Sequence, residues 1–161
     1  MKIILISGNG TGAGKTTLAH TVADQVLSLA DIIRSGLVKK YPAYDWYRKD
    51  QEYKETTLVT ETQKTVREML VEEGQRRCKK NPAYWVQKLA EFIKADAFYK
   101  SQVVAIDDIR KMIELQIMKE KFHGMVSHLH VIYKDAKSEQ HLYGKDDEAL
   151  QAVANYVIIR P

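Results

Sequence analysis

A glycine-rich segment near the amino terminus carries the clearest chemical signal of this chain. Residues 8–17 read GNGTGAGKTT and directly follow the apolar run Ile3–Ile6. Glycines let a backbone curl until several N–H groups point at one anion, and the start of a following helix adds partial positive charge. A buried strand, a glycine-rich turn and Lys-Thr opening a helix are the parts of a phosphate-binding P-loop. We therefore predict a site for the phosphates of a nucleotide.

In a P-loop the lysine reaches the β- and γ-phosphates and the next hydroxyl binds Mg²⁺, which assigns these roles to Lys15 and Thr16. The predicted cofactors are ATP and Mg²⁺. The strict motif has glycine five positions before Gly14, where this chain has Asn9. The loop is either one residue longer or uses Asn9 at a positive φ, which Asn tolerates better than most residues. The predicted ATP-binding residues are Asn9, Gly10, Thr11, Gly12, Ala13, Gly14, Lys15, Thr16 and Thr17.

Two adjacent carboxylates follow a second apolar strand. Asp107 and Asp108 come directly after Val103–Ile106. An acidic residue at a strand tip beside a P-loop holds Mg²⁺ directly or through water, although the same pair could cap the next helix. We predict a metal site of Thr16, Asp107 and Asp108, and the sequence leaves open which aspartate serves the metal. Arg110 is predicted to reach a phosphate across the same edge, with a helix-surface arginine as the alternative.

Phosphoryl transfer depends on neutralising charge around the moving group more than on a base. Arginine suits this task because its planar fork can bind one phosphate through two hydrogen bonds. Each candidate alone is explained as well by a solvated surface charge, but as a set they predict a second anion site. These candidates are Arg34, Arg48, Arg67, Arg76 and Arg77.

Two further segments have both a functional and a structural interpretation. Tyr44, Trp46 and Tyr47 could stack on a nucleotide base, since aromatic faces do this readily, or pack against one another in a lobe. The polar, lysine-rich segment 134–147 is either a lid that closes over phosphates or an ordinary solvated loop.

Hydrophobic patterning predicts apolar strands that alternate with amphipathic helices, hence a parallel sheet covered on both faces. Ligands bind at the carboxyl ends of the strands in such sheets, which brings the candidate residues to one edge. The predicted strands are 2–7, 103–106, 129–133 and 156–159. The first predicted helix is 14–27, and the segment 28–34 is predicted to begin as a short strand and to pass into a helix that ends near Gly36. Four further helices are predicted: one that stops at Gly74, one that follows Pro82, one from Ile109 to near Gly124, and a short one with Leu150 and Val153.

Length and composition set ordinary bounds. A chain of 161 residues fits one domain, residues 1–161, and the single Cys78 fits a reducing, cytoplasmic setting. A net charge of +4 is too weak to indicate nucleic acid, and no apolar run approaches a membrane span. His128 and His130 lack a carboxylate at metal-ligand spacing and are interpreted as structural. We expect neither a nucleic-acid nor a membrane partner, and the oligomeric state stays open, with a homodimer as one option.

The chain resembles the phage-type deoxynucleoside monophosphate kinases, a family within the P-loop nucleoside-monophosphate kinase group. Besides the P-loop, Ser28–Arg34 is similar to the family's FADPLK/R segment, with Ile32 and Ile33 where Pro and Leu are usual. Thr65–Leu70, with Gly74 and Trp85, is similar to the family's T-x-R-x-x-L…G…W stretch. Val104–Arg110, with Glu114, is similar to its D-V-R-F-P-N-E strand end. Ala154–Ile158 is similar to its closing A-D-Y-V-I. Two departures are Lys111–Ile113 in place of Phe-Pro-Asn and the lack of arginine in 134–147.

The resemblance implies an α/β fold, a three-layer P-loop NTPase with a mostly parallel central sheet. It implies transfer of the ATP γ-phosphate to the 5′-phosphate of a (deoxy)nucleoside monophosphate, in a bacterial host cytoplasm, with an acceptor-binding lobe at about 31–82 and a short lid at about 134–147. Lys15, Arg67 and Arg110 are the predicted catalytic residues. Joined with the residues singled out above, the predicted acceptor-binding set is Asp31, Arg34, Trp46, Arg67, Arg76 and Asp108.

The altered P-loop and the arginine-free segment 134–147 keep two other functions open. One is a kinase of a different small metabolite, such as a sugar acid or a phosphorylated alcohol. The other is a nucleotide-binding regulatory ATPase that phosphorylates no small molecule.

Overall fold

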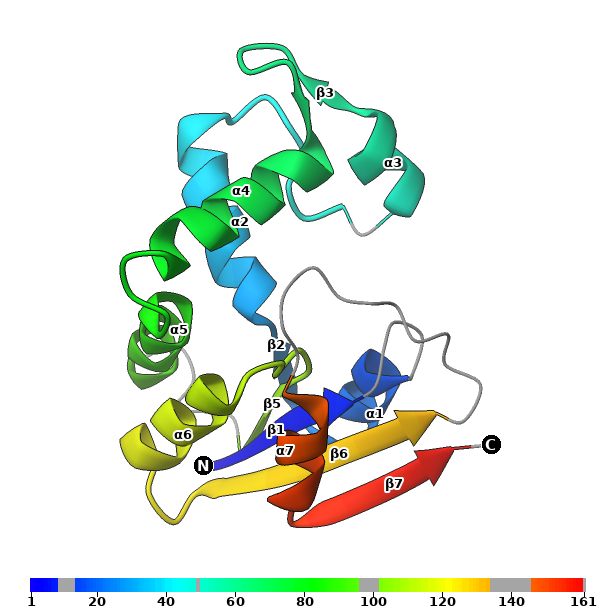
Figure 1. Ribbon diagram of the computed structural model, residues 1–161, viewed down its shortest axis with the longest axis vertical. Helices are drawn as coiled ribbons and strands as arrows, with labels where there is room; N and C mark the ends of the chain where they lie inside the picture. Colours follow the sequence, from blue (N-terminus) through cyan, green and yellow to red (C-terminus); the bar gives the residue numbers. More distant parts are fainter. Residues whose placement is uncertain (9–13, 49, 96–101, 134–145, 161) are drawn as a thin grey trace. The chain divides into compact units, whose positions relative to one another are not determined.

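The computed structural model describes residues 1–8, 14–48, 50–95, 102–133 and 146–160. The chain forms two compact units, which Figure 1 shows as a ribbon. Unit 1 comprises Met1–Ser28 and Ala90–Pro161, and unit 2 comprises Leu29–Leu89. The segment 31–82, predicted to bind an acceptor, therefore lies within unit 2.

Unit 1 is built on a five-stranded sheet in which each neighbouring pair of strands is parallel. The strand order is β2-β5-β1-β6-β7. Since all five strands run in one direction, their carboxyl ends share one edge of the sheet. The strands are β1 (Lys2–Gly8), β2 (Gln25–Leu27), β5 (Val103–Ile106), β6 (Val126–Tyr133) and β7 (Tyr156–Arg160).

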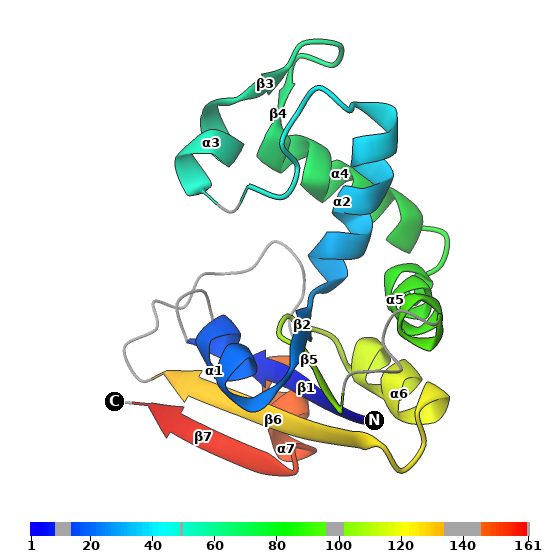
Figure 2. The same ribbon diagram turned by 180° about the vertical axis from the view of Figure 1, so that it is seen from behind.

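Helices cover both faces of this sheet. Helix α1 (Lys15–Val22) lies on one face and α7 (Asp147–Ala152) on the other, as the two opposite views in Figures 1 and 2 show. Helix α6 (Met112–Lys121) buries Leu115 and Met118. The central strands β1 and β5 are mostly apolar because both of their faces are covered. The predicted α/β fold with a mostly parallel central sheet is confirmed.

The core of unit 1 packs α1 against the middle strands. Ile6, Ala19, Ala105 and Val131 form one buried cluster, each fully inaccessible to solvent. Ile6, Ala105 and Val131 come from three adjacent strands, and Ala19 comes from α1. Small alanines on the helix and on β5 allow the helix to approach the sheet closely, which fixes where α1 begins relative to the strand ends.

Unit 2 has a hydrophobic core of its own, formed by Leu37, Trp46, Val59, Val66 and Met69. Its elements are α2 (Leu29–Lys40), α3 (Gln51–Thr56), the hairpin β3 (Leu58–Val59) and β4 (Lys64–Thr65), and α4 (Val66–Cys78). The boundary between the units falls within α5 (Tyr84–Lys94), the helix predicted after Pro82. Helix α4 begins at a capping box, in which the Thr65 side chain and the Glu68 side chain each bind the other residue's backbone N–H.

The end predicted for the first helix is wrong. The helix predicted over 14–27 ends at Val22, and Gln25–Leu27 form an edge strand instead. Asp24 explains this change, because its carboxylate accepts the Val103 N–H at 2.9 Å and its own N–H donates to the Val103 carbonyl at 3.0 Å. These bonds start the pairing of β2 with β5, and tertiary contacts override the helical periodicity.

Further corrections concern the predicted strand at the start of 28–34 and two glycines that do not end their helices. Helix α2 continues through Gly36 to Lys40, and residues 29–34 are helical from the start. Helix α4 continues through Gly74 to Cys78. A Cβ at Gly74 would lie 3.3 Å from Ile33 Cδ1, so this glycine allows close packing of α2 against α4. That packing offsets the roughly 1 kcal/mol that glycine costs inside a helix.

Among the described residues, no helix combines the length and the apolar character that a bilayer crossing requires.

Candidate active site

The glycine-rich loop leaves the sheet at the end of β1, where two strands approach unusually closely. A Cβ at Gly8 would lie 2.2 Å from the carbonyl oxygen of Val131 on β6. Only glycine fits that space, so the residue that opens the loop is set by strand packing. Five of the predicted ATP-binding residues lie outside the described residues: Asn9, Gly10, Thr11, Gly12 and Ala13. Whether the loop is one residue longer or uses Asn9 at a positive φ therefore stays a prediction.

The chain is described again at Gly14, which begins α1. Gly14 has φ 77° and ψ 19°, the left-handed conformation that glycine adopts at little cost. It is the amino-terminal cap of α1, so Lys15 and Thr16 are the first two residues of the helix. The first turn contains no acidic side chain and Gly14 offers no side-chain cap. Backbone N–H groups at such a helix start lack partners within the helix, and an anion can supply one.

Thr16 contacts one of the two candidate aspartates directly. Its hydroxyl donates a 2.6 Å hydrogen bond to Oδ2 of Asp107, a residue only 9% exposed. The Asp107 N–H donates to the Leu27 carbonyl at 3.2 Å, which continues the pairing with β2 and fixes the aspartate in place. Asp108, the next residue, is half-buried. The structure thus pairs Asp107 with Thr16, a choice that the sequence leaves open.

The pair fits Mg²⁺ chemically, because a hydroxyl and a carboxylate are the hard oxygen ligands this ion prefers. Two ligand oxygens 2.6 Å apart can bind the same ion. No group of three or more His, Cys, Asp or Glu side chains gathers at metal-binding distance in the part of the chain that the structure describes. Mg²⁺ commonly uses one or two carboxylates and completes its shell with water and phosphate oxygens, so this small protein contribution is enough.

The turn after β5 is held by a buried carboxylate. Glu114 accepts the N–H of Arg110 at 2.8 Å and of Lys111 at 3.0 Å, and burial raises its pKa. Asp146 ties the same turn to the chain before α7, since its carboxylate accepts the Met112 N–H at 2.7 Å. Arg110 is exposed at this turn. Residues 134–145 of the predicted lid lie outside the described residues.

A buried polar cluster joins β1 to β6 just before the loop. The Ser7 hydroxyl lies 2.8 Å from Nε2 of His128 and 2.8 Å from Nδ1 of His130. A serine hydroxyl can donate to one neutral ring and accept from the other, so the three groups can pair without charge. Burial lowers the pKa of both histidines, that of His128 to about 4, where the charge of Lys119 adds to the effect. This arrangement agrees with a structural role for both rings.

Acid should therefore destabilise the protein through His128. Its ordinary pKa is 6.5 and its folded value is about 4, so the unfolded chain binds more protons between these values. The stability is fully present above pH 6.5 and is lost as the pH falls toward 4. We expect urea denaturation to show a loss of about 2–3 kcal/mol between pH 7 and pH 4.5 from this group. In the variant His128→Gln the loss should shrink by that amount, and an identical pH dependence in both proteins would contradict the assignment.

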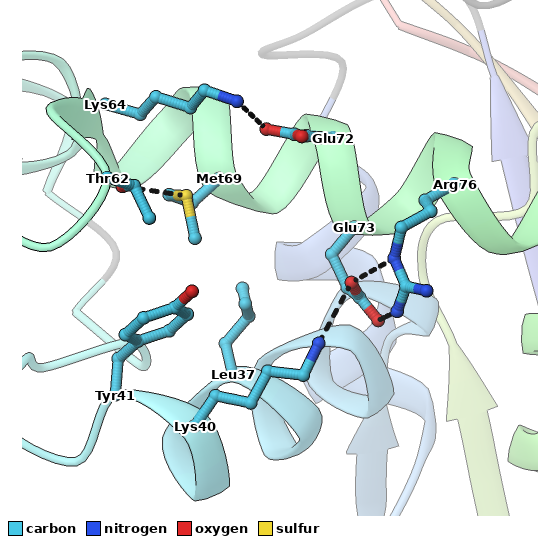
Figure 3. A pocket seen from close by; sticks show the side chains of 9 residues that line it. All are labelled: Leu37, Lys40, Tyr41, Thr62, Lys64, Met69, Glu72, Glu73 and Arg76. Atoms are coloured by element: carbon cyan, nitrogen blue, oxygen red, sulfur yellow. Dashed lines mark hydrogen bonds and ion pairs between the residues drawn. The ribbon is translucent and has the colours of Figure 1, made fainter.

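Unit 2 contains a small pocket between α2, α4 and the hairpin, shown in Figure 3. Its volume is about 180 Å³. Its apolar wall consists of Leu37, Tyr41 and Met69, and charged side chains surround this wall. The full lining is Leu37, Lys40, Tyr41, Thr62, Lys64, Met69, Glu72, Glu73 and Arg76.

Glu73 is the centre of the charged part of this pocket. It is only 8% exposed, and Arg76 binds both of its oxygens, at 2.9 and 2.7 Å. Lys40 lies 3.4 Å and Arg77 3.7 Å from the same carboxylate. Burial acts to raise the pKa of Glu73, but the Arg76 hydrogen bond and the charges of Lys40 and Arg76 outweigh it and lower the pKa. Three cations thus surround one ionised carboxylate, which leaves positive charge for an external anion.

Asp108 belongs to unit 1, and the other predicted acceptor residues lie elsewhere in unit 2. Arg34 is 9% exposed and binds Asp31 at 2.6 Å. Arg67 binds Gln51 at 2.6 Å and Glu55 at 3.4 Å on the exposed side of α4. Trp46 is 1% exposed in the core, so its ring has no open face for a base. This burial favours the alternative that the aromatic cluster packs on itself.

The sequence analysis did not identify Glu73 as the carboxylate that binds the pocket cations. It also did not place Arg160 at the ligand-binding edge of the sheet. Glu73 lies three and four residues before Arg76 and Arg77 on one helix, and this spacing could have indicated that it holds them. Arg160 ends a strand of a parallel sheet, so its presence at the ligand-binding edge could also have been predicted.

No family model and no curated protein matches the chain. Among solved structures, the chain is similar to a sugar kinase from Janibacter sp. HTCC2649, with 18% identity, 99% of this chain and 84% of that chain covered, and a TM-score of 0.44. It is also similar to a gluconokinase from Sinorhizobium meliloti 1021, with 11% identity, 99% and 84% covered, and a TM-score of 0.43. TT1252 from Thermus thermophilus gives 15% identity, 99% and 88% covered, and a TM-score of 0.49. Likenesses at this level carry no argument about activity.

Proposed function

We propose that this protein is a kinase that transfers the γ-phosphate of MgATP to the 5′-phosphate of a (deoxy)nucleoside monophosphate, giving the diphosphate. One observation carries the proposal. The Thr16 hydroxyl contacts the Asp107 carboxylate at 2.6 Å, at the edge of the sheet where α1 begins. A P-loop hydroxyl next to an aspartate from a neighbouring strand is the arrangement with which P-loop enzymes hold nucleotide and metal.

The donor side needs few groups. Lys15 and the N–H groups at the start of α1 would bind and orient the β- and γ-phosphates. Thr16 and Asp107 would hold Mg²⁺. When bound, this ion bridges the phosphates and neutralises the charge that develops during transfer. Because the attacking group is an oxygen of the acceptor phosphate, the protein needs no nucleophile of its own.

The acceptor side is supported by the cations around Glu73. Arg76 is held by both carboxylate oxygens, which fixes its planar fork, and Lys40 and Arg77 add charge nearby. Arginine forks bind phosphates through paired hydrogen bonds. The adjacent pocket of about 180 Å³ is smaller than the cavities that enclose whole ligands, so it would take one end of the acceptor.

Replacing Arg76 should weaken acceptor binding selectively. For Arg76→Gln we expect the acceptor KM to rise about 10- to 100-fold, the loss typical of a charge-assisted hydrogen-bond pair. The KM for ATP should stay within about twofold, since the donor groups lie in unit 1. The control is Lys80→Gln, which removes one positive charge from an exposed residue just after α4. Initial rates at varied acceptor and fixed MgATP measure the effect, and an unchanged acceptor KM would rule out Arg76 as an acceptor residue.

The function itself is tested with a panel of acceptors. The protein is incubated with MgATP and each common ribo- and deoxynucleoside monophosphate, and the products are separated by ion-exchange chromatography. Sugar acids and phosphorylated alcohols form a second arm, because the cations around Glu73 would bind any small anion. A nucleoside diphosphate from one or more acceptors supports the proposal. A phosphorylated sugar acid would change the acceptor class, and inorganic phosphate alone would indicate a regulatory ATPase.

A further inference from the structure

Arg160 ends β7 at the edge of the sheet where the candidate active site lies. We propose that Arg160 is a phosphate-binding residue of the ATP site, in addition to Lys15. This inference rests on the proposed function, because it takes the ligand at α1 to be a nucleoside triphosphate. It adds a group that the P-loop motif does not contain.

The geometry places the Arg160 side chain against the end of the glycine-rich loop. Strand β7 runs parallel to β6, and Arg160 pairs with Tyr133 at the carboxyl end of both strands. A Cβ at Gly14 would lie 1.7 Å from Nη1 of Arg160 and 2.9 Å from its Cζ. The guanidinium therefore occupies the space beside the α-carbon of Gly14, one residue before Lys15. A side chain at position 14 would displace the guanidinium from this place.

This contact gathers positive charge at one point. The start of α1 carries the positive end of the helix dipole, Lys15 is its first residue, and no acidic side chain lies in its first turn. Cations are unfavourable at a helix amino terminus, by about 0.3–1 kcal/mol each at exposed sites. An external anion bound at the start of α1 would be attracted by both cations and by the helix dipole. A triphosphate is such an anion, with oxygens enough for several donors.

Arginine and lysine would do different work at this site. The Lys15 ammonium is a compact point charge, whereas the Arg160 guanidinium is a planar fork that can bind two oxygens of one phosphate. Arg160 is exposed, so its fork is accessible to a ligand from solvent. The sequence leaves a place for such an arginine. Segment 134–147 contains lysines but no arginine, so an arginine fork at the site would come from elsewhere in the chain.

The test is calorimetric titration of the full chain, in the presence of Mg²⁺, with ATP and with inorganic tripolyphosphate. The variants are Arg160→Gln, which removes the charge, and Arg160→Lys, which keeps it without the fork. The control is Lys2→Gln, an equal charge change at an exposed residue at the opposite, amino end of β1. Thermal unfolding of each variant checks that the fold is intact.

For Arg160→Gln we expect the affinity for both ligands to fall about 10- to 100-fold and by similar factors. Arg160→Lys should recover part of this loss, and Lys2→Gln should bind within about twofold of the wild-type protein. The affinity of the wild-type protein should also depend more steeply on salt than that of Arg160→Gln.

Three results would overturn the inference. Unchanged affinity in Arg160→Gln would remove Arg160 from the site while leaving the P-loop assignment intact. A loss for ATP but not for tripolyphosphate would assign Arg160 to the nucleoside. Tighter binding in Arg160→Gln would mean that the side chain obstructs the loop. If the wild-type protein binds neither ligand, the proposed function itself fails, and Arg160 then has no phosphate to bind.

Discussion

Lys15→Ala should abolish phosphoryl transfer without unfolding the protein. Lys15 is the first residue of α1 and follows the left-handed Gly14, a position that would direct its ammonium group to the bound phosphates. Removal of one group that neutralises developing charge costs roughly 10²- to 10³-fold in kcat in other enzymes. We expect a loss of at least about 10³-fold here, because charge neutralisation provides most of the catalysis in this reaction class.

The stability should not change in the same way. Lys15 is half-buried and belongs to no part of the hydrophobic core that packs α1 on the sheet. The melting temperature of Lys15→Ala should therefore stay within about 2 °C of the wild-type value. Lys39→Ala, an exposed lysine on α2, is the matched control and should keep its activity. A Lys15→Ala protein that retains its rate would show that the P-loop assignment is wrong.

Asp107→Asn should cause the second large loss and should change the metal dependence. The amide can still accept the Thr16 hydrogen bond, so the turn after β5 is preserved. The charge that would hold Mg²⁺ is gone, however. We expect kcat to fall about 10²- to 10³-fold and the Mg²⁺ concentration for half-maximal rate to rise about tenfold or more. Steady-state rates over a Mg²⁺ titration measure both effects.

Asp108→Asn is the informative comparison, because the two aspartates are adjacent and the Thr16 hydroxyl donates its hydrogen bond to Asp107. We expect it to lower the rate less and to leave the Mg²⁺ requirement in place. Glu120→Gln, an exposed carboxylate on α6, controls for the loss of one negative charge. If the altered Mg²⁺ requirement appears in Asp108→Asn instead, the metal assignment must move to Asp108.

Much of unit 1 could be predicted from local patterns, because β1 and β5 are short, mostly apolar and buried. Residues 103–106 form β5 as predicted, and the polar residues after them fall at the predicted edge. Strand β2 could not be predicted, because Val26 also continues the helical periodicity of α1. The hydrogen bonds between Asp24 and Val103 decide the outcome, and they join residues far apart in the sequence.

The site shows the same division between local and non-local information. The chain predicts Lys15 and Thr16 from a contiguous motif, but not which aspartate meets Thr16. That choice depends on the turn after β5, which Glu114 and the bond from the Ile109 N–H to the Ile6 carbonyl hold in place. In unit 2, the sequence left open whether Trp46 stacks on a base or packs within the lobe, and the tryptophan lies in the core beside Leu37 and Val59.

Phosphorus NMR of one reaction mixture tests the proposed phosphoryl transfer most directly. The protein is mixed with MgATP and an acceptor nucleoside monophosphate, and the spectrum is followed over time. We expect the γ-phosphate signal of ATP to be replaced by the β-phosphate signals of ADP and of a new nucleoside diphosphate in equal amounts, and Lys15→Ala to give no change. Release of inorganic phosphate without a new diphosphate, for every monophosphate tried, would contradict the proposal.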